Sequence, residues 1–275
     1  MKSLAKPLTI SQLNKIGDRF RKDEAQEDDL RRLDEYRMSF QPAYEHVFSA
    51  LTQLGLNPGG RHPKTIPSIV AKLNREKSRL SKMQDIAGCR VEVPNRIEQD
   101  NLVDDLKSRF SGAQIKDRRE KPSYGYRAVH VIVEVDSYPV EIQVRTALQH
   151  SWASTAEKLS DLIDPQIKYG GGPKEIWEDL TRISNSIVQV ELAEIMFHFL
   201  HEIVDIVPKD KLDCATTRAL EEMAAGRPDI PILKAISERG LANVVEEHES
   251  NFISIREGIN TKLKDLLEAF KIIEQ

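Results

Sequence analysis

Residues 127–146 read RAVHVIVEVDSYPVEIQVRT, and this stretch decides the fold. Apolar and polar side chains alternate on both sides of the segment 136–139, which is Asp-Ser-Tyr-Pro. A period of two is typical of strands with one buried face, and Asp, Ser and Pro favour a turn. The stretch therefore predicts a β-hairpin made of strands at 127–135 and 140–146.

One face of this hairpin carries polar groups. Glu141, Gln143 and Arg145 alternate with apolar residues on the second strand, and His130 of the first strand shares a face with Glu141. Any half-buried antiparallel strand shows such alternation, so a solvated face is one interpretation. The other is a functional site, because charges that become buried need compensation or a use.

The segments around the hairpin complete a predicted α+β unit of helices on a sheet. Further strands are expected at 87–93 and 113–118, with an amphipathic helix at 97–110 between them. Residues 9–55 are expected to be helical, with Ser11 as a cap and Pro42 starting or kinking a helix. The remaining expectations are a chain break at 57–60, a basic helix after it, helices at 147–162 and 176–207, and shorter helices up to residue 275.

Composition and charge exclude several classes of protein. Of the residues, 40% are hydrophobic and 31% charged, which is typical of soluble globular proteins. A net charge of −4 and a pI near 6.0 argue against a surface that binds nucleic acid along its whole length. The two cysteines, Cys89 and Cys214, predict free thiols in a reducing compartment, with no disulfide framework and no metal-ligand spacing.

The sequence also predicts a cytosolic protein. Its first residues lack the apolar stretch of a signal peptide. The most apolar helix, near 187–207, is interrupted by too many polar groups to cross a membrane.

A basic stripe precedes the strand expected at 87–93. Its polar members follow one another at spacings of four, four, three and four residues, which places them on one side of a helix: Lys64, Ser68, Lys72, Arg75 and Arg79. Like charges on adjacent turns repel each other, so a polyanion such as a triphosphate would relieve them. A solvated cationic face is the alternative.

Four motifs follow one another over about a hundred residues. They are a basic helix containing Arg61, Lys64, Ser68, Lys72 and Arg75, then Asp85-Ile86-Ala87-Gly88-Cys89-Arg90, then Gly125 to His130, and Glu141-Ile142-Gln143-Val144-Arg145-Thr146. In this order they resemble the RelA/SpoT-type alarmone synthetases, whose motifs are Arg-x-Lys-x-x-x-Ser-Ile-x-x-Lys, Asp-Ile-x-Gly-x-Arg, Gly-Tyr-x-x-x-His and Glu-Ile-Gln-x-Arg-Thr. The chain has one extra residue after the first arginine, and the resemblance covers roughly residues 40–160.

The resemblance implies an α+β, nucleotidyltransferase-like mixed sheet with flanking helices and a helical C-terminal region. It implies a Mg²⁺-dependent GTP pyrophosphokinase that moves the β,γ-pyrophosphate of ATP onto the 3′-hydroxyl of GDP or GTP, making the alarmone of the stringent response. The expected parts are N-terminal helices over 1–55, a synthetase core over 56–165, and a helical region over 166–275 for oligomerisation or partner binding. The sequence contains no His-Asp dipeptide, the mark of the hydrolase domain in long members, so we expect synthesis without hydrolysis.

The resemblance also assigns roles to single residues. Asp85 and Glu141 are implied as Mg²⁺ ligands, and Glu141 also as the base for the attacking hydroxyl. The implied ATP-binding residues are Arg61, Lys64, Ser68, Lys72, Arg75 and Arg90, and the implied acceptor-binding residues are Lys121, Tyr126, His130, Gln143 and Arg145. Structural alternatives stay open at this point: a turn cap for Asp85, ion pairs for Arg90 and Arg145, and core packing for Tyr126.

One departure concerns the acceptor. Tyr124 stands where the family has the asparagine of Pro-Lys-x-Asn-Gly-Tyr. An amide reads a base edge through paired hydrogen bonds and a phenol does not, so the change bears on which nucleotide is accepted. Besides a guanosine nucleotide, two alternatives remain: the 3′ end of transfer RNA, as in toxin-like short relatives, and a non-catalytic nucleotide-sensing module. A basic run at 116–121 fits either phosphate acceptor, and homo-oligomers are expected because short family members commonly form them.

Overall fold

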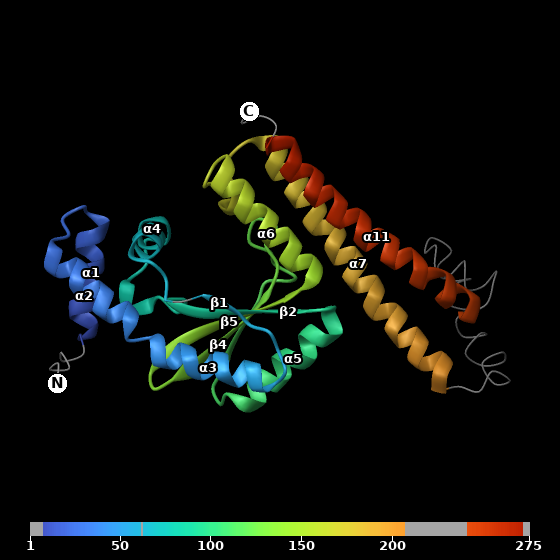
Figure 1. The fold of residues 1–275 in the computed structure, drawn as a ribbon, viewed down its shortest axis with the longest axis horizontal. Helices are drawn as coiled ribbons and strands as arrows, with labels where there is room; N and C mark the ends of the chain where they lie inside the picture. The colour runs from blue at the N-terminus through green and yellow to red at the C-terminus, as the bar shows by residue number, and fades with distance from the viewer. Residues whose placement is uncertain (1–7, 62, 207–240, 272–275) are drawn as a thin grey trace. The chain divides into compact units, whose positions relative to one another are not determined.

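The computed structural model describes residues 8–61, 63–206 and 241–271, and the chain divides into two compact units. A mixed sheet with its helices forms the first unit, and long helices dominate the second (Figure 1). The first contains Met1–Pro94, Glu98–Lys121 and Ala128–Thr146, and the second contains Asn95–Ile97, Pro122–Arg127 and Ala147–Gln275. The functional boundaries expected near residues 55 and 165 stay a prediction, since compactness alone does not assign function.

The first unit contains three N-terminal helices, a five-stranded sheet and the helices between its strands. In chain order its elements are α1 (Ile10–Arg21), α2 (Glu27–Met38), α3 (Gln41–Gln53), β1 (Gly59–Arg61), α4 (Ile66–Glu76), the 3-10 helix η1 (Leu80–Lys82), β2 (Ala87–Val93), α5 (Arg96–Arg109, less its first two residues), β3 (Gln114–Asp117), β4 (Val129–Val135) and β5 (Tyr138–Thr146).

The sheet has the strand order β1-β2-β5-β4-β3. Only the β2–β5 pair is parallel, with Ala87 opposite Val140, and the other three pairs are antiparallel. The predicted hairpin is confirmed as β4 and β5. Its turn consists of Asp136 and Ser137 at φ values of 50° and 69°, the geometry of a two-residue hairpin, so β5 begins at Tyr138. The α+β class with a mixed sheet is therefore confirmed.

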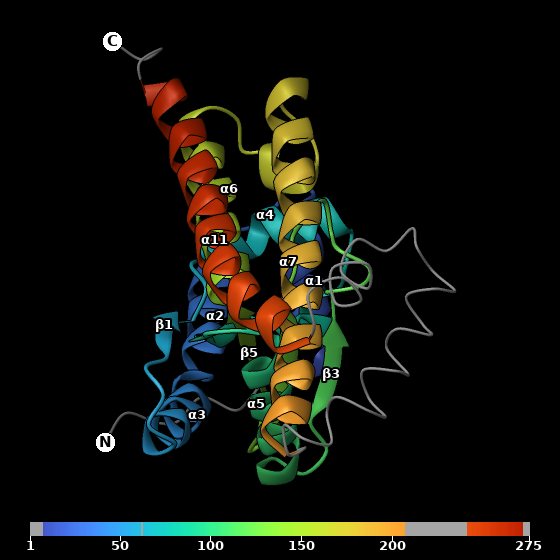
Figure 2. The same cartoon turned by 90° about the vertical axis from the view of Figure 1, so that its right-hand side faces the viewer.

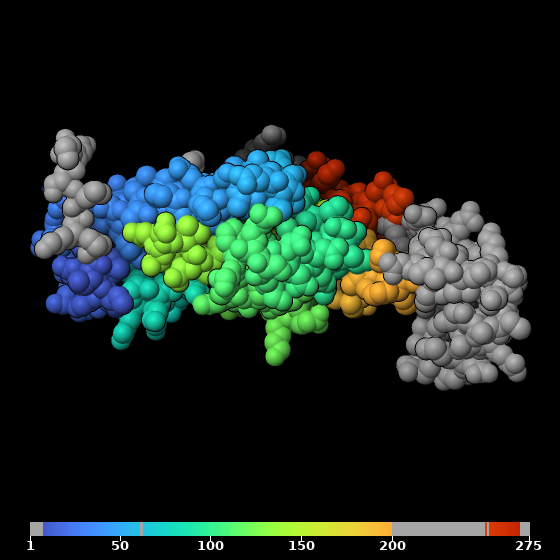
Figure 3. Space-filling model, turned by 90° about the horizontal axis from the view of Figure 1, so that it is seen from below, coloured from blue at the N-terminus to red at the C-terminus, as the bar shows by residue number. Residues whose placement is uncertain are grey.

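The two faces of the sheet differ in polarity. Neighbouring residues Cys89, Ile142 and Val131, on β2, β5 and β4, are buried on one face. Residues of α3 and α5 belong to the same core, and Figure 3 shows these two helices side by side on the outside of the first unit. The opposite face carries the polar side chains, as the alternating sequence predicts.

Helix capping was predicted only in part. Pro42 lies in the first turn of α3, as expected. The cap of α1 is Thr9, because Thr9 accepts the N–H of Gln12 (3.3 Å) while the Gln12 side chain accepts the N–H of Thr9 (2.9 Å). Ser11, the expected cap, lies inside α1, so that prediction was wrong by two residues.

The expected break at 57–60 is partly a strand. Gly59–Arg61 forms β1 and pairs with β2, with Gly59 opposite Arg90. Arg61 therefore lies on a strand, and its expected place on the basic helix was wrong. Extended glycines are compatible with an edge strand when their neighbour supplies the hydrogen bonds.

The second unit is mainly helical, and its long helices follow β5 in the chain. Its elements are α6 (Ala147–Leu162), the 3-10 helix η2 (Ile167–Tyr169), α7 (Lys174–Ile206) and α11 (Leu241–Lys271). Helix α11 packs against both α6 and α7, and Figures 1 and 2 show it running along α7. Trp152, Leu180 and Leu263 are buried in their shared core. None of the helices in the described residues is long and apolar enough to cross a membrane.

Shorter helices were expected after α7, yet α11 extends over 31 residues. That prediction was wrong for 241–271, because a stretch without Gly-Pro breaks and with apolar residues at helical spacing continues as one helix. Residues 207–240 lie outside the described residues, and so does Cys214.

Candidate functional site

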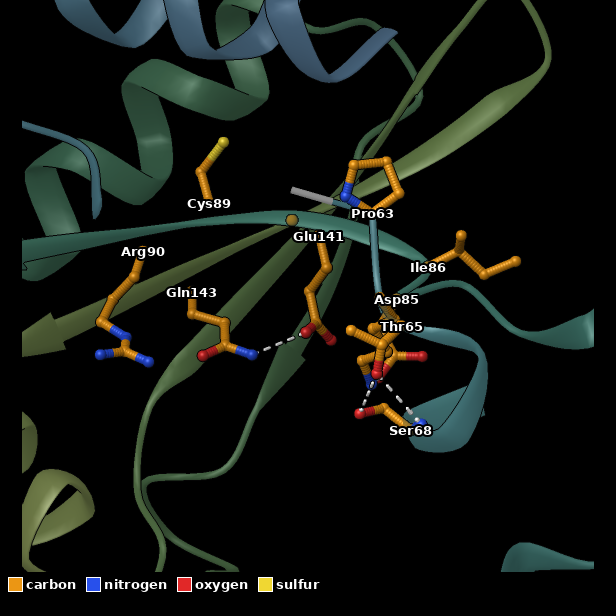
Figure 4. A pocket seen from close by; sticks show the side chains of 11 residues that line it. Pro63, Thr65, Ser68, Asp85, Ile86, Cys89, Arg90, Glu141 and Gln143 are labelled. Carbon is orange, nitrogen blue, oxygen red and sulfur yellow. Dashed lines mark hydrogen bonds and ion pairs between the residues drawn. The ribbon is translucent and has the colours of Figure 1, made fainter. Parts of the chain in front are cut away.

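A pocket of about 320 Å³ lies in the first unit, on the polar side of β2 and β5. Figure 4 shows Arg90, Gln143 and Glu141 extending into the same region, while Cys89 points to the opposite side of the sheet. The pocket brings together six residues selected from the sequence: Lys64, Ser68, Asp85, Arg90, Glu141 and Gln143. The register explains part of this, because Arg90 and Gln143 are direct neighbours in the parallel pair.

Asp85 is held between two lysines just before β2. Its Oδ2 accepts from the ammonium groups of Lys64 and of Lys72, the latter at 2.6 Å. Burial raises the pKa of Asp85, but the two ammonium groups outweigh it, so the pKa lies below its ordinary value. The other oxygen, Oδ1, is buried and has no hydrogen-bond partner. Asp85 is therefore an ionised carboxylate with one oxygen left for a ligand.

The two lysines reach Asp85 from different elements. The N–H of Lys64 donates to the carbonyl of Ile86 (2.7 Å), which fixes this segment beside β2. Helix α4 begins only after Thr65, whose hydroxyl accepts the N–H of Ser68 (3.4 Å). Lys72 lies two turns further along α4.

The predicted five-residue stripe was wrong at both of its ends. Lys64 precedes the cap of α4, and the helix ends at Glu76 because Lys77 adopts a left-handed conformation with φ 48°. Arg79 therefore lies beyond the helix, as the N-cap of η1. The helix itself carries three of the five residues: Ser68, Lys72 and Arg75.

Glu141 ends a hydrogen-bonded row along β5 and also contacts His130 of β4. Arg145 donates to Gln143 (2.8 Å), Gln143 donates to Glu141 Oε2 (2.8 Å), and His130 Nδ1 lies 2.9 Å from Glu141 Oε1. Burial raises the pKa of Glu141, but the hydrogen bond and electrostatic effect of His130, together with Gln143 and Lys72, lower it to about 2. Glu141 is therefore ionised at neutral pH.

A second polar row crosses the sheet at right angles to the first. Arg90 on β2, Gln143 on β5, His130 on β4 and Lys116 on β3 are successive register neighbours. Alternation along each strand places all four on the polar face. The sequence did not predict Lys116 as part of this row, because only the β3–β4 register shows that it lies opposite His130.

Gly88 leaves room for the backbone beside Glu141. A Cβ at position 88 would lie 2.7 Å from the carbonyl oxygen of Glu141, closer than real Cβ contacts. The sequence motif contains this glycine, but its contact became visible only with the β2–β5 register. On the other side of the strand, burial raises the pKa of the Cys89 thiol to about 12.

The remaining residues selected from the sequence, where their side chains are described, do not line the pocket. Lys121 is exposed, and Arg145 is almost fully buried behind Gln143. Arg75 lies beside Glu76 (3.2 Å). Tyr126 belongs to the second unit, where its ring packs partly buried against the helical core. The side chain of Arg61 lies outside the described residues.

The pocket fits a metal ion that takes few protein ligands. The described part of the chain contains no cluster of three or more His, Cys, Asp or Glu side chains that could hold a metal. Mg²⁺ commonly takes one or two carboxylates and completes its shell with phosphate oxygens and water. Asp85, through its partnerless Oδ1, and Glu141 are suited to that role.

Comparison with known proteins identifies the family. Residues 61–160 match the model described as the region found in RelA / SpoT proteins. GTP pyrophosphokinase YwaC of Bacillus subtilis is 30% identical over 156 residues, which cover 50% of this chain and 67% of that protein. The chain belongs to the RelA/SpoT family. This confirms the resemblance found in the four motifs.

Other relatives are matched over less of their own length or show the fold alone. An uncharacterized protein of Mycobacterium tuberculosis is 38% identical over 137 residues, and the chain spans 48% of that relative's length. The crystal structure of small alarmone synthetase 2 from Bacillus subtilis has a TM-score of 0.50 at 25% identity, covering 62% of this chain and 98% of that one. Small alarmone synthetase 1 with its product pppGpp shares the fold, with a TM-score of 0.50 at 21% identity, 63% coverage of this chain and 99% of that one.

Proposed function

We propose that this RelA/SpoT chain transfers the β,γ-pyrophosphate of ATP to the 3′-hydroxyl of GDP or GTP. One observation carries the proposal: two ionised carboxylates, Asp85 and Glu141, line one pocket together with the cationic side chains of Lys64 and Arg90. Carboxylates that hold Mg²⁺ and cations that bind phosphate are the parts that phosphoryl transfer requires. The name of the relative YwaC, GTP pyrophosphokinase, supports the same reaction.

Asp85 and Glu141 would hold Mg²⁺, which neutralises charge on phosphate oxygens when it is bound. Lys64 and Lys72 share Oδ2 of Asp85, so both ammonium groups are already gathered at the carboxylate. Triphosphate oxygens offer these lysines a second anionic partner. The lysines would bind the donor phosphates, and Asp85 would hold the metal through Oδ1.

The donor side consists of the start of α4 and the neighbouring strands. Ser68, Lys72 and Arg75 lie on one side of α4, and Arg90 projects from β2 into the pocket. We assign them to the phosphates of ATP, since guanidinium and ammonium groups are strong phosphate donors. Arg61, on β1, is assigned to adenine by the family resemblance.

The acceptor side centres on Glu141. His130 and Gln143 each bond one oxygen of Glu141, and Arg145 supports Gln143, so all three residues orient this carboxylate. Lys121 and Tyr126 are assigned to the phosphates and the base of the acceptor by the resemblance. Stacking on an aromatic ring contributes about 1–3 kcal/mol per base and tolerates different bases.

A pKa of about 2 makes Glu141 a weak base, because general bases work best with a pKa near the ambient pH. Phosphoryl transfer with a loose transition state needs little proton removal before bond breaking. We therefore assign Glu141 to orient the attacking hydroxyl and to accept its proton late in the reaction.

Transfer RNA is the competing acceptor, and the basic run at 116–121 is its main support. Within that run Arg119 is only 11% exposed, and it pairs with Asp100 (2.5 Å) and Asp117 (2.6 Å). Lys116 donates to Gln84 (2.6 Å). Two carboxylates neutralise Arg119, whereas Lys116 keeps its charge beside a neutral amide, so the run offers a polynucleotide less positive charge than its sequence suggests, which favours a nucleotide acceptor.

The test supplies the purified protein with ATP labelled at the γ-phosphate, Mg²⁺ and either GDP, GTP or bulk transfer RNA. We expect label on the guanosine nucleotide, and we expect none with Asp85→Asn protein that unfolds at the same temperature as wild type. Label on transfer RNA alone would replace the nucleotide acceptor by the toxin-like reaction. Nucleotide binding without transfer to any acceptor would favour the sensing module.

A further inference from the structure

The turn that carries Tyr126 is built on the helices of the second unit. Ser123 and Tyr126 exchange two backbone hydrogen bonds of 3.2 and 3.0 Å, and Tyr124 and Gly125 between them have φ values of 55° and 86°. Positive φ at both central positions defines a tight type I′ turn, for which Asn-Gly is the preferred sequence. Tyr124 therefore stands at a position where asparagine is also favoured for its backbone alone.

A serine in the middle of α7 forms a hydrogen bond to this turn. Ser184 is 1% exposed, and its hydroxyl donates to the carbonyl oxygen of Gly125 (2.6 Å). The same hydroxyl accepts from Nε of buried Arg127 (3.0 Å), whose Nη2 donates to Asn185 (3.2 Å). Two consecutive helix residues thus hold the turn and the residue that follows Tyr126.

The bonding of Ser184 is unusual for a serine inside a helix. Such hydroxyls commonly bond the carbonyl four residues earlier, as Ser186 does with Arg182 (3.1 Å). Ser184 instead reaches a carbonyl 59 residues away in the sequence. A buried hydroxyl that serves only its own helix would not fix a distant turn.

The turn also contacts α6. A Cβ on Gly125 would lie 2.7 Å from the ring of Trp152, and the indole N–H of Trp152 donates to the carbonyl of Leu180 (2.7 Å). Gly125 is therefore enclosed between α6 and α7. Tyr126 follows Gly125 and lies three residues before β4, so the enclosed turn leaves its backbone little freedom to change direction.

We infer that Ser184 is a positioning residue for the acceptor nucleotide, acting through Gly125 and Arg127 on the stacking residue Tyr126. This inference rests on the proposed function, in which Tyr126 binds the acceptor base. It assigns a task to α7, a helix from which sequence reasoning selected no site residue. Loss of the hydroxyl frees the turn and weakens acceptor binding, while the ATP-binding residues of the first unit keep their contacts.

The experiment compares Ser184→Ala and Ser184→Thr with the matched control Ser186→Ala in the full chain. For Ser184→Ala we expect the KM for the guanosine nucleotide to rise about tenfold, the size set by losing hydrogen bonds of ordinary strength, with the KM for ATP changed less than about twofold. Ser184→Thr keeps the hydroxyl and restores much of the loss. Ser186→Ala behaves as wild type.

A second measurement does not depend on catalysis. Hydrogen exchange of the backbone amides of Ser123 and Tyr126 should become faster in Ser184→Ala than in wild type, and should stay unchanged in Ser186→Ala. Unchanged exchange overturns the inference even if the enzyme is active. Faster exchange in Ser184→Ala, with the KM values for the guanosine nucleotide and for ATP both as in wild type, overturns the acceptor role. Absence of transfer by wild type, with faster exchange in the variant, contradicts the proposed function and the acceptor role but leaves the grip on the turn established.

Discussion

Glu141 keeps its charge because three neighbours outweigh its burial. His130, Gln143 and Lys72 all lower its pKa, against the desolvation that raises it. Asp85 has the same balance with two lysines. Both carboxylates are thus prepared as anions before any ligand arrives, and each can be tested by an amide of the same size.

For Asp85→Asn and Glu141→Gln we expect turnover to fall by about a hundredfold or more, since each change removes a charge that binds metal. The control is Glu134→Gln, an exposed glutamate of β4. Rates of pyrophosphate transfer at saturating substrates measure the effect. A variant that keeps more than about a tenth of the wild-type rate, a loss below roughly 1.4 kcal/mol, would remove its residue from this role.

The lowered pKa of Glu141 also predicts how stability depends on pH. A carboxyl group with a folded pKa of about 2 and an ordinary value of 4.5 stabilises the fold fully above about pH 4.5 and loses this contribution as the pH falls towards 2. Urea unfolding across this range should show a steeper loss for wild type than for Glu141→Gln. Parallel curves would mean that the carboxylate is not stabilised in the fold.

The pairing of β2 with β5 is the element on which the site depends. Asp85 lies just before β2 and Glu141 lies in the first half of β5, with Gly88 directly opposite Glu141. Their backbones approach each other at a point where a Cβ does not fit. A change at this glycine therefore tests the strand pair and the site together.

We expect Gly88→Ala to lower the free energy of unfolding by about 1–3 kcal/mol, as overpacking in a core does, and to reduce turnover. Gly59→Ala is the matched control, because a Cβ on this β1 glycine would meet its neighbours at ordinary distances of 3.7 Å and more. Denaturant unfolding gives the stability of both. Equal stability of Gly88→Ala and wild type would show that β5 moves aside without cost.

The elements that follow local periodicity were predictable, and those that depend on register or caps were not. The strand at 87–93 and the helix at 147–162 have the bounds that alternation and helical spacing indicate. The extent of α4 depended on the Thr65 cap and on a left-handed Lys77, which spacing alone does not reveal. Whether the motif residues of the candidate site perform the assigned chemistry stays a prediction.

At the scale of the whole molecule, α7 exposes apolar side chains that a stable surface usually covers. Leu192, Met196 and Phe199 are 47%, 38% and 56% exposed and lie at spacings of four and three. Their spacing places them on one side of the helix. The expected oligomer would bury this stripe, since contiguous apolar patches mark interaction sites.

Light scattering at micromolar concentration should therefore show more than one copy per particle. We expect the double change Leu192→Glu with Phe199→Glu to reduce the number of copies, because charges become buried if the interface forms. Ile10→Glu on α1 serves as the control, since Ile10 is 70% exposed in the first unit. A monomeric wild-type chain would contradict the assembly role of the C-terminal helices.

The thiol behind the pocket offers a way to follow binding without any reaction. Cys89 is 2% exposed, and its pKa of about 12 leaves almost no thiolate, so an alkylating reagent reaches it only when β2 opens. In a Cys214→Ser chain, the labelling rate then reports the opening equilibrium of the strand that forms the pocket floor. A nucleotide at a hundred times its Kd should slow labelling by about a hundredfold, because it stabilises the closed form by about 2.7 kcal/mol. The alkylation rate of Cys89, on the apolar face of β2, would thereby report ligand binding on the polar face, including ligands that the protein binds but never converts.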